Sequence, residues 1–239
     1  DPWKAMVQPP WERLREKYHK AQFNDTPRSL YYHYIINREF MKEEKDFCSV
    51  KCFDGGLEFL ELNRNAENWF LQIETFDPHE PFFAPSRFRK DYPTNYKGPI
   101  RDWPPYSRVT EAPDECDELR ANYSAIIALC DAQLGRLLDY FDENNMWHDT
   151  ALIVTTDHGF LLGEHDWWAK IRMPCYDEIA HIPLFIHHPN FCNQAGTRRR
   201  SLTQTIDLMP TILDVFGIKP PTEVEGKSIL SIMNKDSPI

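Results

Sequence analysis

The chain has 239 residues, of which 41% are hydrophobic and 27% are charged. This is the composition of a folded globular protein with one sizeable core. A net charge of −10 argues against a nucleic-acid-binding protein, which needs a basic face. No apolar run approaches the roughly 20 residues that span a bilayer, and residues 1–10 lack the pattern of a signal peptide. We therefore expect neither nucleic acid nor membrane as a partner, while secretion and the oligomeric state stay open.

The six cysteines are too few for a disulfide scaffold in a chain of this length. Cys48 and Cys52 lie four residues apart, which is the wrong spacing for a redox or zinc CxxC pair. Free thiols are therefore predicted, and they weakly favour a reducing compartment such as the cytoplasm.

The N-terminal part of the chain is polar, aromatic and helix-like. Residues 11–20 form a charged helical stretch, and residues 29–45 are predicted to form another with Ser29 as its N-cap. Asp54-Gly55-Gly56 is interpreted as a break before a third helix that ends near Asn65.

The next segment, 69–76, is rich in strand-forming residues and stops at Asp77-Pro78. We predict a strand there, ended by the proline, which lacks a backbone donor. Residues 80–113 are rich in Pro, Tyr and Arg and show little periodicity. Irregular segments of this length typically bind or cover something.

The C-terminal half alternates helices and strands. Apolar residues recur at three- and four-residue steps over 115–143, which predicts a long amphipathic helix. The apolar run 151–155 then indicates a strand buried on both faces of a parallel sheet. A second strand is predicted over 183–187, and a helix over 204–216, closed by Gly217. The fold class is therefore α/β.

Two predicted strands end in an acid and a histidine within three residues, at Asp77-Pro78-His79 and at Asp157-His158-Gly159. In open α/β sheets, ligands bind just outside the carboxyl ends of the strands. Asp157 and His158 can both ligate a cation. The alternative is an ordinary turn in which Asp157 caps the residues that follow.

Lys170 follows a glycine-broken loop that contains Trp167 and Trp168. A lysine among aromatic side chains near a cation site can clamp an anionic ester oxygen, because its ammonium group is a compact positive charge. The alternative is a surface lysine beside two core tryptophans.

Several segments together resemble the signature of the type I sulfatases, which belong to the alkaline phosphatase superfamily. The wording of the motifs is most similar to the iduronate-2-sulfatase-like branch. The segments, in the family's order, are 76–82, 123–138, 155–165 with 168–170, 180–184, 206–211 and 225–228. The resemblance runs from about Trp69 to Leu230, and the first 68 residues fit only loosely. It implies an alkaline-phosphatase-like fold with a mixed, largely parallel sheet flanked by helices. Residues 1–239 are then expected to be one incomplete sulfatase-type domain.

The resemblance also implies roles for individual residues. Asp157 and His158 match two of the family's metal ligands. His79 matches the histidine that contacts the sulfate and helps protonate the leaving oxygen, and Lys170 matches the lysine that binds a sulfate oxygen. His165 is close enough in the motif to line the substrate pocket, but it can equally serve to orient the loop.

The family's nucleophile is not found in these residues. It is a formylglycine made from Cys or Ser in a Cys/Ser-x-Pro/Ala-x-Arg motif, and no Cys or Ser of this chain satisfies that motif. The paired N-terminal aspartates, the other two metal ligands, are not found either. We therefore expect a truncated chain or one piece of a split protein, with the nucleophile upstream and most of the family's C-terminal lobe absent.

The functional expectation is a metal-dependent sulfuric ester hydrolase that acts, when complete, on a sulfated small molecule or sugar. The resemblance implies Ca²⁺, with Mn²⁺ or Zn²⁺ as the second choice because His158 offers nitrogen. The alternatives are a phosphonate monoester or phosphodiester hydrolase of the same superfamily, and a noncatalytic module that keeps the fold.

Overall fold

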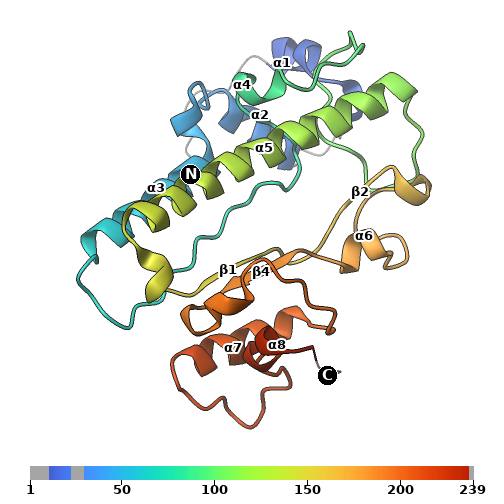
Figure 1. The fold of residues 1–239 in the computed structure, drawn as a ribbon. Coiled ribbons are helices and arrows are strands. Elements are labelled where there is room, and N and C mark those ends of the chain that lie inside the picture. The colour runs from blue at the N-terminus through green and yellow to red at the C-terminus, as the bar shows by residue number, and fades with distance from the viewer. Residues whose placement is uncertain (1–10, 23–29, 237–239) are drawn as a thin grey trace. The chain divides into compact units, whose positions relative to one another are not determined.

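The computed structural model describes residues 11–22 and 30–236 (Figure 1). The helices are α1 (Trp11–Lys17), α2 (Leu30–Arg38), α3 (Cys48–Leu62), α4 (Ser86–Arg89), α5 (Pro113–Glu143), α6 (Asp177–Ala180), α7 (Leu208–Val215) and α8 (Leu230–Asn234). The strands are β1 (Leu152–Thr155), β2 (Leu161–Leu162), β3 (Trp168–Ala169) and β4 (Leu184–His187). Short 3₁₀ helices are η2 (Lys20–Gln22), η3 (Glu44–Asp46), η4 (Met146–His148), η5 (Glu164–Asp166), η6 (Pro189–Gln194) and η7 (Thr205–Asp207).

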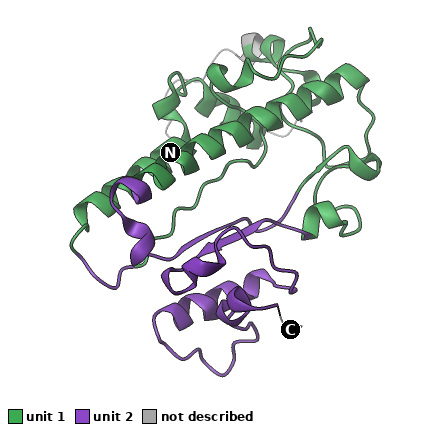
Figure 2. Ribbon diagram, viewed as in Figure 1, with its two compact units in different colours: residues 1–65, 70–140, 160–180 green, residues 66–69, 141–159, 181–239 purple. Residues whose placement is uncertain are grey.

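The chain divides into two compact units (Figure 2). Unit 1 comprises residues 1–65, 70–140 and 160–180, and unit 2 comprises 66–69, 141–159 and 181–239. All six cysteines are free thiols, as predicted. Within the described residues, no helix combines the length and the apolarity that a membrane span requires. The predicted helix 29–45 is shorter in the structure, and its predicted cap, Ser29, lies outside the described residues.

Helix α5 is the central element of unit 1, as the amphipathic pattern predicts. Its buried residues Ala125, Ile126 and Leu129 pack against Phe82 and Phe88 of the segment before it. Near its beginning, Cys116 and Leu119 pack with Trp168 and Ala169 of β3. Helix α5 therefore packs both against the segment that follows His79 and against strand β3, which directly precedes Lys170.

The predicted break at Asp54-Gly55-Gly56 is wrong, because α3 runs through it from Cys48 to Leu62. Gly56 is buried, and a Cβ atom there would lie 2.4 Å from Cδ1 of Ile73. The glycine thus permits a close approach between α3 and the segment that leads to His79. A pair of glycines can mark either a break or a close approach, and sequence pattern alone does not separate the two.

The predicted strand over 69–76 is also not formed. Residues 70–76 do alternate between exposed and half-buried side chains, which is the period of a strand. No strand among the described residues pairs with this run, however, and a strand is defined by its backbone hydrogen bonds to a neighbour. The pattern therefore identifies the extended conformation but cannot supply its partner.

In unit 2 the two predicted strands are present as β1 and β4. They pair in antiparallel register, with Leu152 opposite His187 and Thr155 opposite Leu184. The parallel pairing predicted for β1 is therefore wrong for this pair, and no residue of β1 is fully buried. An apolar run predicts a strand, but it does not determine the direction of the strand beside it.

Two of the sequence motifs, 206–211 and 225–228, contact each other in unit 2. Asp207, before α7, is buried and accepts backbone hydrogen bonds from Gln204 and from Lys227, each at 2.8 Å. Thr211 Oγ1 accepts from the backbone N–H of Ile229 at 3.0 Å. These bonds hold segment 225–229 against the start of α7, so both motifs serve to build this unit.

Gly226 is the tightest point of that contact, which gives a stability prediction. A Cβ atom at this position would lie 2.1 Å from the backbone oxygen of Ile206. Because backbone has to move, we expect Gly226→Ala to lower the free energy of unfolding by about 1–3 kcal/mol, the usual cost of overpacking. Thermal and urea unfolding would measure the change.

The matched control is Gly135→Ala in α5, where an added Cβ meets nothing within 4 Å. That variant should be neutral or more stable by up to about 1 kcal/mol, since alanine is the better helix former. An unaltered melting temperature for Gly226→Ala would contradict the contact described.

Candidate functional site

The segment Asp77-Pro78-His79 lies at the end of the extended run 70–76, in unit 1. Asp77 accepts a hydrogen bond from Ser49 Oγ of α3. Burial raises the pKa of the Asp77 carboxyl, although the Ser49 hydrogen bond and the nearby His79 act in the opposite direction. The contact anchors the segment to α3, immediately before the histidine.

The ring of His79 has a fixed orientation. Nδ1 donates to the backbone oxygen of Glu80 at 2.7 Å, and the ring stacks on Phe76 with centroids 4.2 Å apart. Because the Nδ1 proton is used on the backbone, Nε2 is the nitrogen available for a substrate.

Lys170 follows strand β3 and is only 8% exposed. Its neighbours Ala169 and Ile171 both have a φ of 71°, in the left-handed region that β-branched residues rarely adopt. Such strained backbone persists only where the surrounding structure imposes it, and it is concentrated at functional sites. The ammonium nitrogen lies 5.9 Å from the ring centroid of Phe160. The alternative of a surface lysine is therefore wrong.

A buried network holds the strand that carries Lys170. Trp168 is fully buried, and its indole N–H donates to Glu111 Oε2 at 2.8 Å. The other oxygen of Glu111 pairs with the guanidinium of Arg101 at 2.8 Å, and both of these side chains are almost completely buried. The backbone N–H of Trp168 donates to the carbonyl of Ser107 at 3.0 Å. The irregular segment 80–113 thus positions β3.

Glu80 lies close to both predicted residues, His79 and Lys170, although no sequence motif pointed to it. Its Oε2 atom lies 3.3 Å from Nδ1 of His79 and 3.9 Å from Nζ of Lys170. Its Oε1 atom accepts a hydrogen bond from the hydroxyl of Tyr106. The structure therefore brings His79 and Lys170, 91 positions apart in the numbering, to one buried carboxylate. The only signal in the sequence was the position of an acidic residue directly after His79.

His165 has partners of its own within unit 1. Its ring stacks on Tyr176 at 3.8 Å between centroids, and Nε2 lies 3.1 Å from both carboxylate oxygens of Glu178. The residue has a φ of 53° at the turn of η5. These contacts favour the interpretation in which His165 orients the loop between β2 and β3, over a direct contact with substrate.

Asp157 and His158 follow β1 in unit 2, at the carboxyl end of that strand as predicted. The Asp157 side chain is 81% exposed, and its Oδ2 atom lies 3.4 Å from Nε2 of His158. The ring is oriented by a hydrogen bond from Nδ1 to the carbonyl of Gly159 at 2.8 Å. Burial, the largest single influence, raises the pKa of the Asp157 carboxyl, but His158 and the local hydrogen bonds together outweigh it and lower the pKa below its usual value.

This pair fits one half of a divalent metal site. A carboxylate and an imidazole Nε2 face each other, and an oriented Nδ1 is typical of metal-ligating histidines. Within the described residues, no group of three or more His, Cys, Asp or Glu side chains could hold a metal ion. The two residues thus have suitable chemistry but too few ligands for tight binding.

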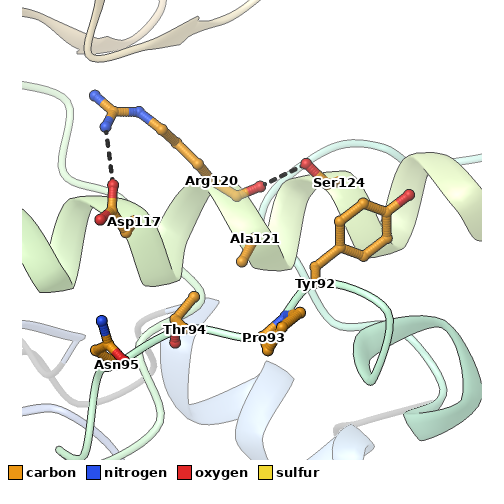
Figure 3. Close-up of a pocket in the computed structure, with 8 residues that line it drawn as sticks. All are labelled: Tyr92, Pro93, Thr94, Asn95, Asp117, Arg120, Ala121 and Ser124. Atoms are coloured by element: carbon orange, nitrogen blue, oxygen red, sulfur yellow. Dashed lines mark hydrogen bonds and ion pairs between the residues drawn. The ribbon is translucent and has the colours of Figure 1, made fainter.

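One pocket lies elsewhere in unit 1, away from these residues. It has a volume of about 340 Å³ and is formed by residues 92–95 and the first half of α5 (Figure 3). Arg120 at its edge pairs with Asp117 at 3.5 Å and donates to the carbonyl of Leu162 at 2.8 Å. None of the predicted site residues lines this pocket, so it carries no part of the site.

Comparison with known proteins gives consistent matches. The sequence model of the family described as Sulfatase matches residues 10–218, so the match includes the N-terminal helices that the motifs fitted only loosely. The multifunctional alkaline phosphatase superfamily protein PehA of Trinickia caryophylli is 29% identical over 203 residues, covering 73% of this chain and 39% of that protein. The N-acetylglucosamine-6-O-sulfatase of Bacteroides thetaiotaomicron is 32% identical over 115 residues, covering 48% of this chain and 20% of that protein.

Among solved structures, the phosphonate monoester hydrolase of Silicibacter pomeroyi superposes with a TM-score of 0.66 at 28% identity. The match covers 83% of this chain and 43% of that one. The alkaline-phosphatase-like fold class predicted from the sequence is thereby confirmed. The chain spans less than half the length of each of these three proteins. Since the family model covers most of the sequence and the fold agrees with it, this chain belongs to the sulfatase family.

Proposed function

We propose that the complete protein, comprising this chain and a nucleophile segment supplied from outside it, hydrolyses sulfate monoesters. The observation that carries the proposal is the assembly of His79 and Lys170 at the buried carboxylate of Glu80, in a chain of the sulfatase family. The proposal also assigns Asp157 and His158 to the divalent metal of the reaction.

The residues of this chain have complementary tasks in such a reaction. The Lys170 ammonium binds a non-bridging sulfate oxygen and stabilises the negative charge of the transition state. His79, in its protonated form, gives the Nε2 proton to the ester oxygen as the S–O bond breaks, so that the leaving group departs as a neutral alcohol. The family resemblance implies a formylglycine hydrate outside this chain, which would supply the hydroxyl that attacks the sulfur.

Asp157 and His158 would hold the divalent metal of the site. When bound, such an ion lowers the pKa of a coordinated hydroxyl and neutralises charge on the ester. Ca²⁺ is the first choice by resemblance to the family, and Mn²⁺ or Zn²⁺ is the second, because an imidazole nitrogen suits transition metals.

The metal proposal gives a direct prediction. The complete protein, purified and then dialysed with each ion in turn, should retain one equivalent of metal, measured by elemental analysis. We expect Asp157→Ala to lower the affinity for that metal by at least about tenfold, since a charged ligand is lost. The control is Asp149→Ala, because Asp149 is an exposed aspartate in the same unit. Equal metal content in the wild type and in Asp157→Ala would exclude this aspartate as a ligand.

The second candidate is hydrolysis of phosphonate monoesters or phosphodiesters. It is favoured by the similarity to the phosphonate monoester hydrolase of Silicibacter pomeroyi and to PehA. The two candidates share the same residues, because sulfate and phosphonate esters have similar anionic oxygens. Substrate preference therefore has to be measured.

The deciding experiment compares turnover of the complete protein on 4-nitrophenyl sulfate, 4-nitrophenyl phenylphosphonate and bis(4-nitrophenyl) phosphate. We expect the highest kcat/KM on the sulfate. A higher value on either phosphorus ester would favour the second candidate. Absence of turnover on all three would instead support a noncatalytic module.

The natural substrate is proposed to be a sulfated sugar. The 32% identity to an N-acetylglucosamine-6-O-sulfatase supports this class, and the iduronate-2-sulfatase-like motifs agree with it. Selectivity is expected to depend on segment 80–113, which provides Tyr106 beside the site. A panel of sulfated monosaccharides, assayed by sulfate release, would test the proposal.

A further inference from the structure

The carboxylate of Glu80 has an unusual environment. The residue is 1% exposed, and its Oε2 atom is buried without a hydrogen-bond donor. That oxygen lies 3.3 Å from Nδ1 of His79 and 3.9 Å from the Lys170 ammonium nitrogen. The oxygen thus faces the two side chains to which the proposed function assigns the chemistry.

Burying the Glu80 carboxylate in this way costs free energy unless its charge stabilises a neighbouring group. Burying a carboxylate with an oxygen that lacks a hydrogen bond costs more than burying a neutral amide of the same shape. A glutamine here could still accept the hydrogen bond from Tyr106, so the structural bond alone does not require a charge. What a glutamine cannot provide is a counter-charge for Lys170.

Tyr106 and Phe160 complete the surroundings of Glu80 and Lys170. Tyr106 donates to Oε1, and burial together with this hydrogen bond raises the pKa of Tyr106, so its phenol remains a donor at neutral pH. The Phe160 ring flanks the Lys170 ammonium and packs edge-on against Phe82, with centroids 5.5 Å apart. The carboxylate therefore has one fixed position relative to the Lys170 ammonium and the His79 imidazole.

We propose, resting on the function proposed above, that Glu80 is a positioning residue: its buried carboxylate holds the Lys170 ammonium directed at the sulfate, and restrains the ring of His79. Glu80 itself does not contact the ester. Its effect reaches the substrate through Lys170 and His79.

The test compares Glu80→Gln with the wild type in the complete protein. We expect kcat/KM on 4-nitrophenyl sulfate to fall by about 10- to 100-fold, the usual loss when a reacting group is slightly misplaced, with most of the loss in kcat. A second readout does not depend on turnover. Lys170 should be acetylated several-fold faster in the variant, relative to the exposed Lys51, as measured by peptide mass spectrometry.

The matched control is Glu118→Gln. Glu118 is a partly buried carboxylate of unit 1 that accepts hydrogen bonds from Arg89 and Thr94, away from Glu80. Whatever its effect on the melting temperature, this variant should change neither kcat nor the labelling ratio. Wild-type kcat/KM together with an unchanged labelling ratio in Glu80→Gln would overturn the proposal. If the wild type turns over none of the three esters, the proposed function fails, while the labelling ratio still decides the role of Glu80.

Discussion

Replacing Lys170 by alanine is expected to lower kcat/KM on sulfate monoesters by about 10²–10³-fold, the effect of removing one group that stabilises transition-state charge. The reason is geometric. The ammonium is almost buried, next to an aromatic ring and one carboxylate, so few other groups can take its place. Steady-state kinetics of the complete protein would measure the loss.

Two further variants make this result specific. Lys170→Arg keeps the charge but changes its shape, and should recover only part of the activity, because a planar guanidinium does not replace a compact ammonium. Lys51→Ala removes an exposed lysine from α3 in the same unit and should leave turnover unchanged. Turnover of Lys170→Ala at the wild-type rate would remove Lys170 from the mechanism.

Replacing His79 by alanine is expected to have an effect that depends on the leaving group. With a sugar sulfate, whose alkoxide leaves poorly without a proton, kcat/KM should fall by about 10²–10⁴-fold, the range for loss of general acid catalysis. With 4-nitrophenyl sulfate the phenolate leaves readily without a proton, so the loss should be much smaller. The ratio of the two losses therefore measures proton donation by His79.

His148→Ala is the control for this series, since His148 is an exposed histidine of η4. This variant should leave kcat/KM unchanged on both substrates. Equal losses on the two substrates in His79→Ala would show that His79 binds the sulfate without protonating the leaving oxygen.

The elements predicted best from the sequence are those whose own pattern is sufficient to define them. The apolar repeat of α5 and the short apolar runs of β1 and β4 each appear close to their predicted bounds. Helix α7 also begins and ends within the predicted range, before Gly217. In these segments, side-chain periodicity and local stop signals agree.

The errors arise where a neighbour distant in sequence decides the structure. Gly56 is buried against Ile73, so a pair of glycines that resembled a break lies inside α3. The run 70–76 has strand periodicity but no paired strand among the described residues. Whether β1 pairs in parallel or antiparallel register is decided by β4, and the apolar pattern of β1 carries no information about that partner.

The candidate site shows the same division. Lys170 and His79 were identified from motifs, because residue type and order along the chain are sequence properties. Glu80 was overlooked, since its importance depends on burial and on the approach of Tyr106 and Lys170, which follow it by 26 and 90 positions in the numbering. Contacts of this kind require coordinates.

The central claim is that His79 and Lys170 together bind the sulfate group. A crystal structure of the complete protein, grown with its metal and with inorganic sulfate as product, tests it most directly. We predict sulfate oxygens in contact with Nζ of Lys170 and Nε2 of His79, and a metal ion ligated by Asp157 and His158. Sulfate bound away from Lys170, or a metal held without Asp157 and His158, would contradict the account.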